Sequence, residues 1–202
     1  MIISARSPQA KEAKELVEGL QAYFVSKLNA VALKFGEGKS CESVSWGRDE
    51  GKHGGGTRYE ARDSMVFDRG SVNVSQVHYD DDDKKKLGSA TAISTIIHPR
   101  NPHAPSMHMH ISWTQMKEGT GYWRVMADLN PSLISESGSD KERFSATLQK
   151  VTGKLYEEGA AQGDRYFYIP VLDRHRGVSH YYLEGYNTGN FEADKAFVLE
   201  VG

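Results

Sequence analysis

The hydrophobic positions of the chain follow a helical pattern first and an alternating pattern later. An apolar stripe at helical spacing comes after Ser7 and Pro8, which are typical of a helix N-cap and of a first helical position. We expect this helix to end at Gly36 and a loop to cover 36–56, either as a plain connection or over a pocket. Alternation then predicts strands near 57–62, 65–69, 71–79, 90–98, 107–114 and 121–128.

The last third of the chain returns to a mixed pattern. Ser139 and Glu142 form a capping box, which predicts a helix that ends at Gly159. Two strands are expected near 166–171 and 178–184, and Asn190 caps a final helix. Short connections between the central strands imply antiparallel pairing. The fold class is therefore α+β, with helices packed on a large antiparallel sheet.

Composition excludes several functional classes. The 202 residues are 38% hydrophobic with a formal net charge of −2, so nothing favours binding to nucleic acid. The apolar runs are too short for an integral membrane segment, and the first residues do not form a secretory signal. The single cysteine, Cys41, cannot form an intramolecular disulfide, so we expect a cytoplasmic protein.

The candidate functional residues lie on two predicted strands joined by a proline-rich loop over 99–105. After the loop, alternation places His108, His110 and Ser112 on one strand face, and a hairpin return brings His98 towards His108. Clustered imidazoles suit general acid and base catalysis or metal ligation. A metal-dependent oxygenase or hydrolase with His98, His108 and His110 as ligands is therefore one hypothesis.

The run HPRNPHAPSMH, residues 98–108, resembles the active-site stretch of oxygen-dependent coproporphyrinogen III oxidases. Further motifs of that family occur in the same order along the chain: Trp46 with Arg48, Gly54 to Gly56, Val66 to His78, Asp128 with Leu129 and Pro131, Tyr166 to Tyr168, and Arg176 with Gly177. The resemblance thus covers most of the sequence.

The resemblance implies a fold, an activity and a set of site residues. The fold is a large antiparallel sheet flanked by helices on both faces. The activity is oxidative decarboxylation of coproporphyrinogen III to protoporphyrinogen IX in haem biosynthesis, by a homodimer that uses molecular oxygen and requires no flavin or haem, with a divalent Mn or Mg ion as an option. The expected site residues are His108 as proton donor with Glu184 and Asp128 as further catalytic groups; Ser94, His110, Ser112, Arg48 and Arg176 for substrate; and His98 with His108 for a metal.

Two departures from the family pattern affect this hypothesis. The family carries N-x-R where this chain has His110-Ile111-Ser112, and a serine cannot replace a guanidinium unless Arg100, Arg124, Arg174 or Arg176 reaches the same carboxylate. Nothing matches the family's C-terminal R-G-R-Y-V-E-F-N segment, so we expect 1–202 to be a single domain that is incomplete at its C-terminus. A non-catalytic porphyrin-binding homologue is therefore another alternative.

Overall fold

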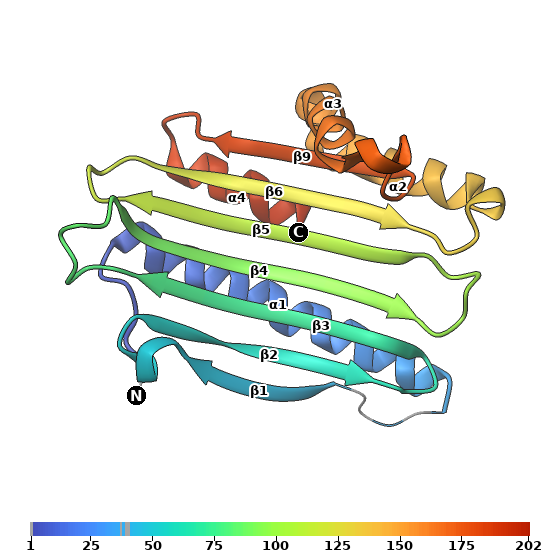
Figure 1. Ribbon diagram of the computed structural model, residues 1–202, viewed down its shortest axis with the longest axis horizontal. Helices are drawn as coiled ribbons and strands as arrows, with labels where there is room; N and C mark the ends of the chain where they lie inside the picture. Colours follow the sequence, from blue (N-terminus) through green and yellow to red (C-terminus); the bar gives the residue numbers. More distant parts are fainter. Residues whose placement is uncertain (1, 37, 39–40) are drawn as a thin grey trace.

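A seven-stranded antiparallel sheet forms the centre of the protein (Figure 1). This computed structural model describes residues 2–36, 38 and 41–202. The strand order is β1-β2-β3-β4-β5-β6-β9, and every neighbouring pair is antiparallel. The strands are β1 (Glu42–Gly47), β2 (Gly54–Arg62), β3 (Phe67–His78), β4 (Leu87–Pro99), β5 (Ser106–Met116), β6 (Gly121–Asn130) and β9 (Ser179–Tyr186).

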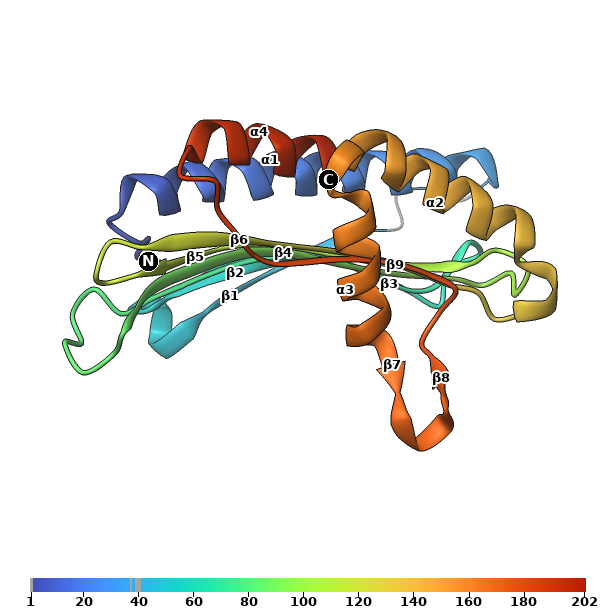
Figure 2. The same ribbon diagram turned by 90° about the horizontal axis from the view of Figure 1, so that it is seen from above.

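Helices lie on both sides of this sheet, in unequal amounts. They are α1 (Pro8–Lys34), α2 (Gly138–Thr152), α3 (Tyr156–Phe167) and α4 (Phe191–Val201). Figure 2 shows α1, α2 and α4 as a layer on one face, while α3 passes the β9 edge to the opposite side. There the short strands β7 (Tyr168–Ile169) and β8 (Arg174–His175) form a projecting hairpin. The predicted α+β class with a large antiparallel sheet is confirmed.

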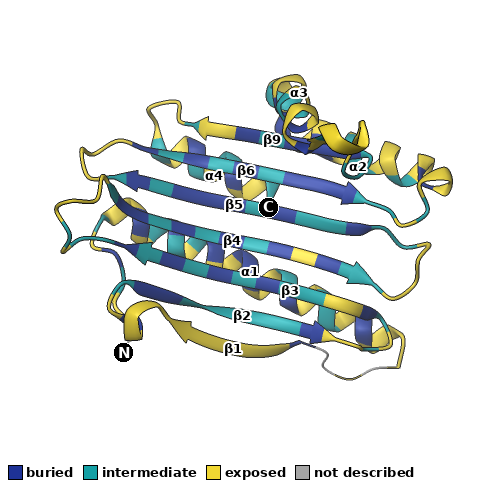
Figure 3. Cartoon of the chain, viewed as in Figure 1, coloured by how far each residue is buried: buried dark blue, intermediate teal, exposed yellow. Residues whose placement is uncertain are grey.

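The main core lies between the sheet and the layer of α1, α2 and α4. Ile93, Ile111 and Val125 point into it and are fully buried, and the alternation of buried and less buried residues along β3 and β4 is visible in Figure 3. Gln21 of α1 donates hydrogen bonds from Nε2 to the carbonyls of Thr57 and Val72, at 2.7 and 2.9 Å, which ties the helix to the sheet. No described helix has the length and apolarity needed to cross a membrane.

Two predicted helix starts are confirmed by their caps. The Ser7 hydroxyl accepts from the Ala10 amide at 3.3 Å, and α1 ends at Lys34, close to the predicted stop at Gly36. The Asn190 side chain accepts from the Ala193 amide at 3.1 Å and begins α4. Each cap satisfies an amide that has no partner within the helix.

The predicted loop over 36–56 is wrong from residue 42 onward. Residues 42–47 form the edge strand β1, a 3₁₀ turn named η1 (Arg48–Gly51) follows, and β2 begins at Gly54; residues 37 and 39–40 lie outside the described part. All six residues of β1 are exposed, so this strand lacks the apolar alternation that reveals a half-buried one. The strands expected at 65–69 and 71–79 are one strand, β3, with an irregular register near its start.

Helix boundaries in the last third also differ from the prediction. The helix begins at Gly138, and the hydroxyl of the preceding Ser137 donates to the Ile134 carbonyl at 2.7 Å, so the Ser139 capping box is wrong. The chain turns at Gly153, whose φ is 53°, and Gly159 lies inside α3. The strand expected at 166–171 is reduced to two residues because α3 continues to Phe167.

Candidate active site

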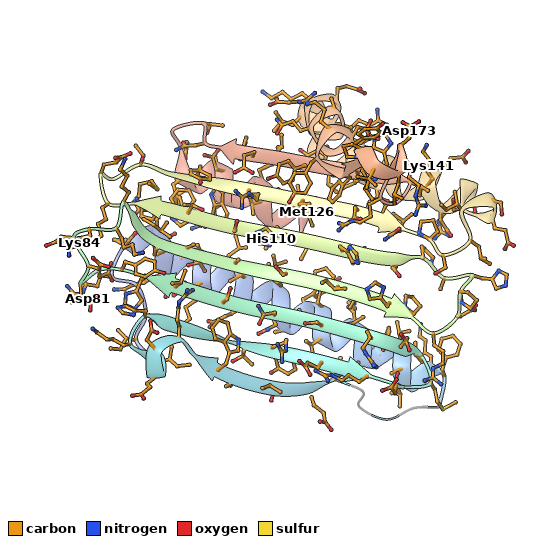
Figure 4. All side chains as sticks on the ribbon, in the orientation of Figure 1. Asp81, Lys84, His110, Met126, Lys141 and Asp173 are labelled. Carbon is orange, nitrogen blue, oxygen red and sulfur yellow. The ribbon has the colours of Figure 1, made fainter. Side chains whose placement is uncertain are left out.

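A cavity of about 350 Å³ lies on the sheet face opposite α1 and α4, over the middle of β4, β5 and β6. Figure 4 shows His110 of β5 and Met126 of β6 side by side on this face. The register explains the grouping, because strand pairing places Ser94, His110, Met126 and Tyr182 in one row and Ile96, His108, Asp128 and His180 in the next. Tyr166 and Phe167 at the end of α3, together with Arg176, complete the wall.

One half of the site is built around the buried carboxylate of Asp128. Arg176 donates to it from Nε at 3.1 Å and from Nη2 at 2.9 Å, and no part of Asp128 is exposed. Nδ1 of His108 lies 3.3 Å from Oδ1 of the same carboxylate. Nε2 of His108 is buried and meets no hydrogen-bond partner among the described residues. The arrangement orients the imidazole and leaves Nε2 as the ring nitrogen without a hydrogen-bond partner among the described residues.

Arg176 is itself held in place by the wall of the cavity. Its guanidinium carbon lies 4.5 Å from the centroid of the Phe167 ring, a cation–π geometry. The ring of His180 stacks on Phe167, with centroids 5.1 Å apart, and its Nε2 bonds the Arg176 carbonyl. Nδ1 of His180 bonds Asp164 of α3 at 3.1 Å. The end of α3 therefore positions the arginine that holds Asp128.

The other half of the site begins at His110. Its Nδ1 lies 2.8 Å from the hydroxyl of Ser94 on the neighbouring strand. Burial lowers the pKa of His110, and the positive charge of Arg124 lowers it further. A neutral imidazole can both donate and accept a hydrogen bond, so this pair offers polar contacts to a ligand in the cavity.

Arg124 of β6 and Glu184 of β9 form a bidentate ion pair next to His110. Nε and Nη2 of the guanidinium donate to the two carboxylate oxygens at 2.7 and 2.5 Å. The hydroxyl of Tyr182 donates to Glu184 as well, and the Tyr182 ring stacks on Tyr166 with centroids 4.4 Å apart. The hydrogen bonds from Arg124 lower the pKa of Glu184, while burial and the contact with Glu184 raise the pKa of Tyr182 to about 12.

The histidines do not fit a divalent ion. The rings of His98 and His108 meet edge to face with centroids 5.3 Å apart, and Nδ1 of His98 is bonded to Ser106 at 2.9 Å. Burial, and then the neighbouring His108, lowers the pKa of His98. Mg²⁺ and Mn²⁺ prefer oxygen ligands, yet the carboxylate beside His108, that of Asp128, is already held by Arg176. Within the described ranges, no group of three histidine, cysteine or acidic side chains could hold a metal.

The structure brings most of the predicted site residues together. The cavity is lined by four of them, Ser94, His108, His110 and Arg176. The other three contact lining residues: Asp128 lies next to His108, Glu184 is paired with Arg124, and the ring of His98 meets that of His108. Ser112 is buried on the same face and pairs with Arg124 across the strands. Arg48 is not brought to this site, because it follows β1 at the far edge of the sheet, about 19 Å from β5 at ~4.8 Å per strand.

Sequence reasoning missed the apolar part of the cavity. Ile96 is 44% exposed although it is an apolar residue within the strand predicted at 90–98, and Met126 lies beside His110. The alternation along β6 carried a usable signal, since Arg124 and Met126 share the strand face of Asp128. The placement of Phe167 had no such signal, because it depends on how α3 ends.

Comparisons with known proteins find a matching family model and relatives over most of the chain. Residues 12–202 match the family model described as coproporphyrinogen III oxidase. The oxygen-dependent coproporphyrinogen-III oxidase of Prochlorococcus marinus is 30% identical over 181 residues, which cover 83% of this chain and 50% of that protein. The mitochondrial enzyme of Rattus norvegicus is 29% identical over 76% of this chain and 39% of its own length. For the protein of Rickettsia akari, the identity is 28% over 79% of this chain and 60% of that protein. The chain thus spans about half the length of the curated relatives it matches.

Proposed function

The chain belongs to the coproporphyrinogen III oxidase family, and on this basis we propose that its cavity converts coproporphyrinogen III to protoporphyrinogen IX with molecular oxygen, a step of haem biosynthesis. The observation that carries the proposal is His108, oriented by a buried carboxylate and facing the cavity. In each of two steps a propionate becomes a vinyl group and releases CO₂. Dioxygen takes up two electrons and two protons and leaves as hydrogen peroxide.

The described residues provide proton transfer and orientation for this chemistry. His108 exchanges the proton at Nε2, and Asp128 holds the opposite nitrogen and stabilises the charge that develops on the ring. Arg176 holds the Asp128 carboxylate in place through its two hydrogen bonds. His108 and Asp128 are therefore the catalytic pair of the proposal.

The tetrapyrrole requires an apolar surface and partners for its carboxylates. Ile96 and Met126 offer an apolar floor, and Tyr182 with its stacked neighbour Tyr166 offers an aromatic wall. Ser94 and His110 add hydrogen-bonding groups at the centre of the cavity. Carboxylates of the substrate can pair with the guanidinium groups that line the cavity, those of Arg124 and Arg176.

The remaining parts of the proposal rest on the family. The electron-rich pyrrole supplies the electrons, so the reaction needs no flavin or haem, and we assign no step to a divalent ion because the ligand set does not fit one. We further propose that the active protein is a cytoplasmic homodimer that binds a tetrapyrrole and molecular oxygen.

The proposal is tested by incubating the folded protein with coproporphyrinogen III in air and measuring protoporphyrin fluorescence after chemical oxidation. His108→Ala should lower the rate by about 10²- to 10⁴-fold, the usual loss when a general acid or base is removed. His103→Ala is the matched control, because His103 belongs to the same motif but is exposed and bonded to Glu136. No product from the folded parent, together with tight tetrapyrrole binding, would overturn the proposal in favour of a non-catalytic homologue.

A further inference from the structure

The ion pair of Arg124 and Glu184 lies at the wall of the cavity rather than in the core. Arg124 lines the cavity, and the two side chains are 36% and 41% exposed. An ion pair exposed to this extent contributes little to stability, because water screens the attraction and two long side chains lose freedom. The pair is therefore not explained by stability of the fold.

The surroundings of the pair allow the guanidinium to change its partner. Across the strands Arg124 faces Ser112, a small residue that does not compete for the guanidinium. Glu184 keeps a second hydrogen-bond donor, the hydroxyl of Tyr182, when it loses the arginine. The neighbouring His110 has a pKa lowered by burial, so it adds no full positive charge that would hold Glu184 in the cavity wall.

We propose that Arg124 is a carboxylate-binding residue of the cavity and that Glu184 is its internal competitor, which an incoming substrate carboxylate displaces. The inference rests on the proposed function only where it names a propionate of the tetrapyrrole as that carboxylate. No covalent bond changes: one bidentate carboxylate replaces another on the same guanidinium. Before the exchange, the hydrogen bonds from Arg124 lower the pKa of Glu184, so Glu184 occupies the guanidinium as an ionised carboxylate.

Competition of this kind predicts selectivity for ligands with several carboxylates. A single carboxylate must displace Glu184 without other anchors, whereas a ligand held elsewhere presents its carboxylate at high effective concentration. Removing the negative charge of Glu184 should therefore tighten binding of every ligand that uses Arg124. Removing the guanidinium should weaken the same ligands and leave esters unaffected.

The experiment measures binding of coproporphyrin III, the oxidised form that cannot be turned over, and of its tetramethyl ester. Glu184→Gln should bind coproporphyrin III about fivefold more tightly than the parent, the ratio for ~1 kcal/mol at 1.4 kcal/mol per tenfold. Arg124→Gln should bind it at least tenfold more weakly. Glu60→Gln is the matched control, since Glu60 also pairs with arginines, Arg58 and Arg62, but does not line this cavity.

A second readout needs no porphyrin. The rate at which phenylglyoxal modifies Arg124, followed by mass spectrometry, should rise in Glu184→Gln and fall again when sodium propionate is added. Protection of Arg124 by propionate without any porphyrin binding would support the carboxylate site while the proposed function fails. Equal affinity of parent and Arg124→Gln for coproporphyrin III, together with normal turnover, would overturn the carboxylate site and leave the proposed function intact.

Discussion

Replacing Arg176 by methionine should destabilise the protein strongly, because it leaves the buried Asp128 carboxylate without its two strongest donors. Asp128 is 0% exposed and receives hydrogen bonds from Arg176 at 3.1 and 2.9 Å. Breaking a fully buried ion pair costs about 3–5 kcal/mol. Arg176 is 39% exposed, so part of this energy is screened by water, and we expect about 2–3 kcal/mol. For a chain of this length that corresponds to a fall in Tm of about 5–10 °C.

The assay is urea unfolding of four proteins: the parent, Arg176→Met, Asp128→Asn and the double variant. Because the cost arises from an unpaired buried charge, the double variant should be more stable than Arg176→Met, with a coupling energy above about 1 kcal/mol. Additive effects, or a loss below about 0.5 kcal/mol for Arg176→Met, would refute the reasoning. The rescue by the double variant keeps the test decisive if the single variant unfolds too readily to be measured.

Three further changes test other parts of the structure. Burial lowers the pKa of His110 in the folded state, so the unfolded state binds more protons as the pH falls from about 7 to 5. The free energy of unfolding should therefore decrease over this range, and it should decrease less steeply in His110→Asn. Equal pH slopes of the unfolding free energy in the two proteins would contradict this. Gly159→Ala should cost about 1–3 kcal/mol, because a Cβ there would lie 2.1 Å from the Tyr181 ring, whereas Gly19→Ala, with nothing within 4 Å, should stabilise; similar Tm shifts would refute the contact. Asn190→Ala should lose about 1 kcal/mol of unfolding free energy and Asn190→Ser should retain most of it, and equal losses would show that the cap is unimportant.

The parts of the fold that sequence reasoning predicted correctly are those where one local rule dominates. The cap at Ser7 and the alternation from Met107 to Trp113 each depend on neighbouring residues only. The errors occur where tertiary packing decides. Gly159 would end a helix in isolation, yet it continues α3 because only a glycine there allows the helix to approach the Tyr181 ring. The edge strand β1 is held by pairing with β2 and has no buried face of its own.

The same distinction applies to the candidate site. Alternation placed His108 and His110 on one face of β5, and the proline-rich loop predicted that His98 returns beside His108. Position along a strand does not show which residue lies opposite on the next strand. The pairs of Asp128 with His108 and of Arg124 with Ser112 depend on the register between β5 and β6. The motif with Arg48 occurs in the family's order along the sequence, but Arg48 follows β1, which lies at the edge of the sheet far from the cavity.

The register between β5 and β6 also explains how this cavity has a guanidinium although Ser112 stands where the family motif N-x-R has its arginine. Strands lie about 4.8 Å apart, so a guanidinium on β6 reaches the same part of the cavity as one from the facing position on β5. Ser112 and Arg124 occupy two such facing positions, and the Arg124 side chain reaches the carboxylate of Glu184 on β9. A guanidinium on β6 lies on the strand next to β9 and reaches Glu184, whereas a guanidinium on β5 would lie one strand farther away. On the proposal above, Arg124 supplies the carboxylate-binding group that Ser112 lacks, and its ion pair with Glu184 is the competing interaction.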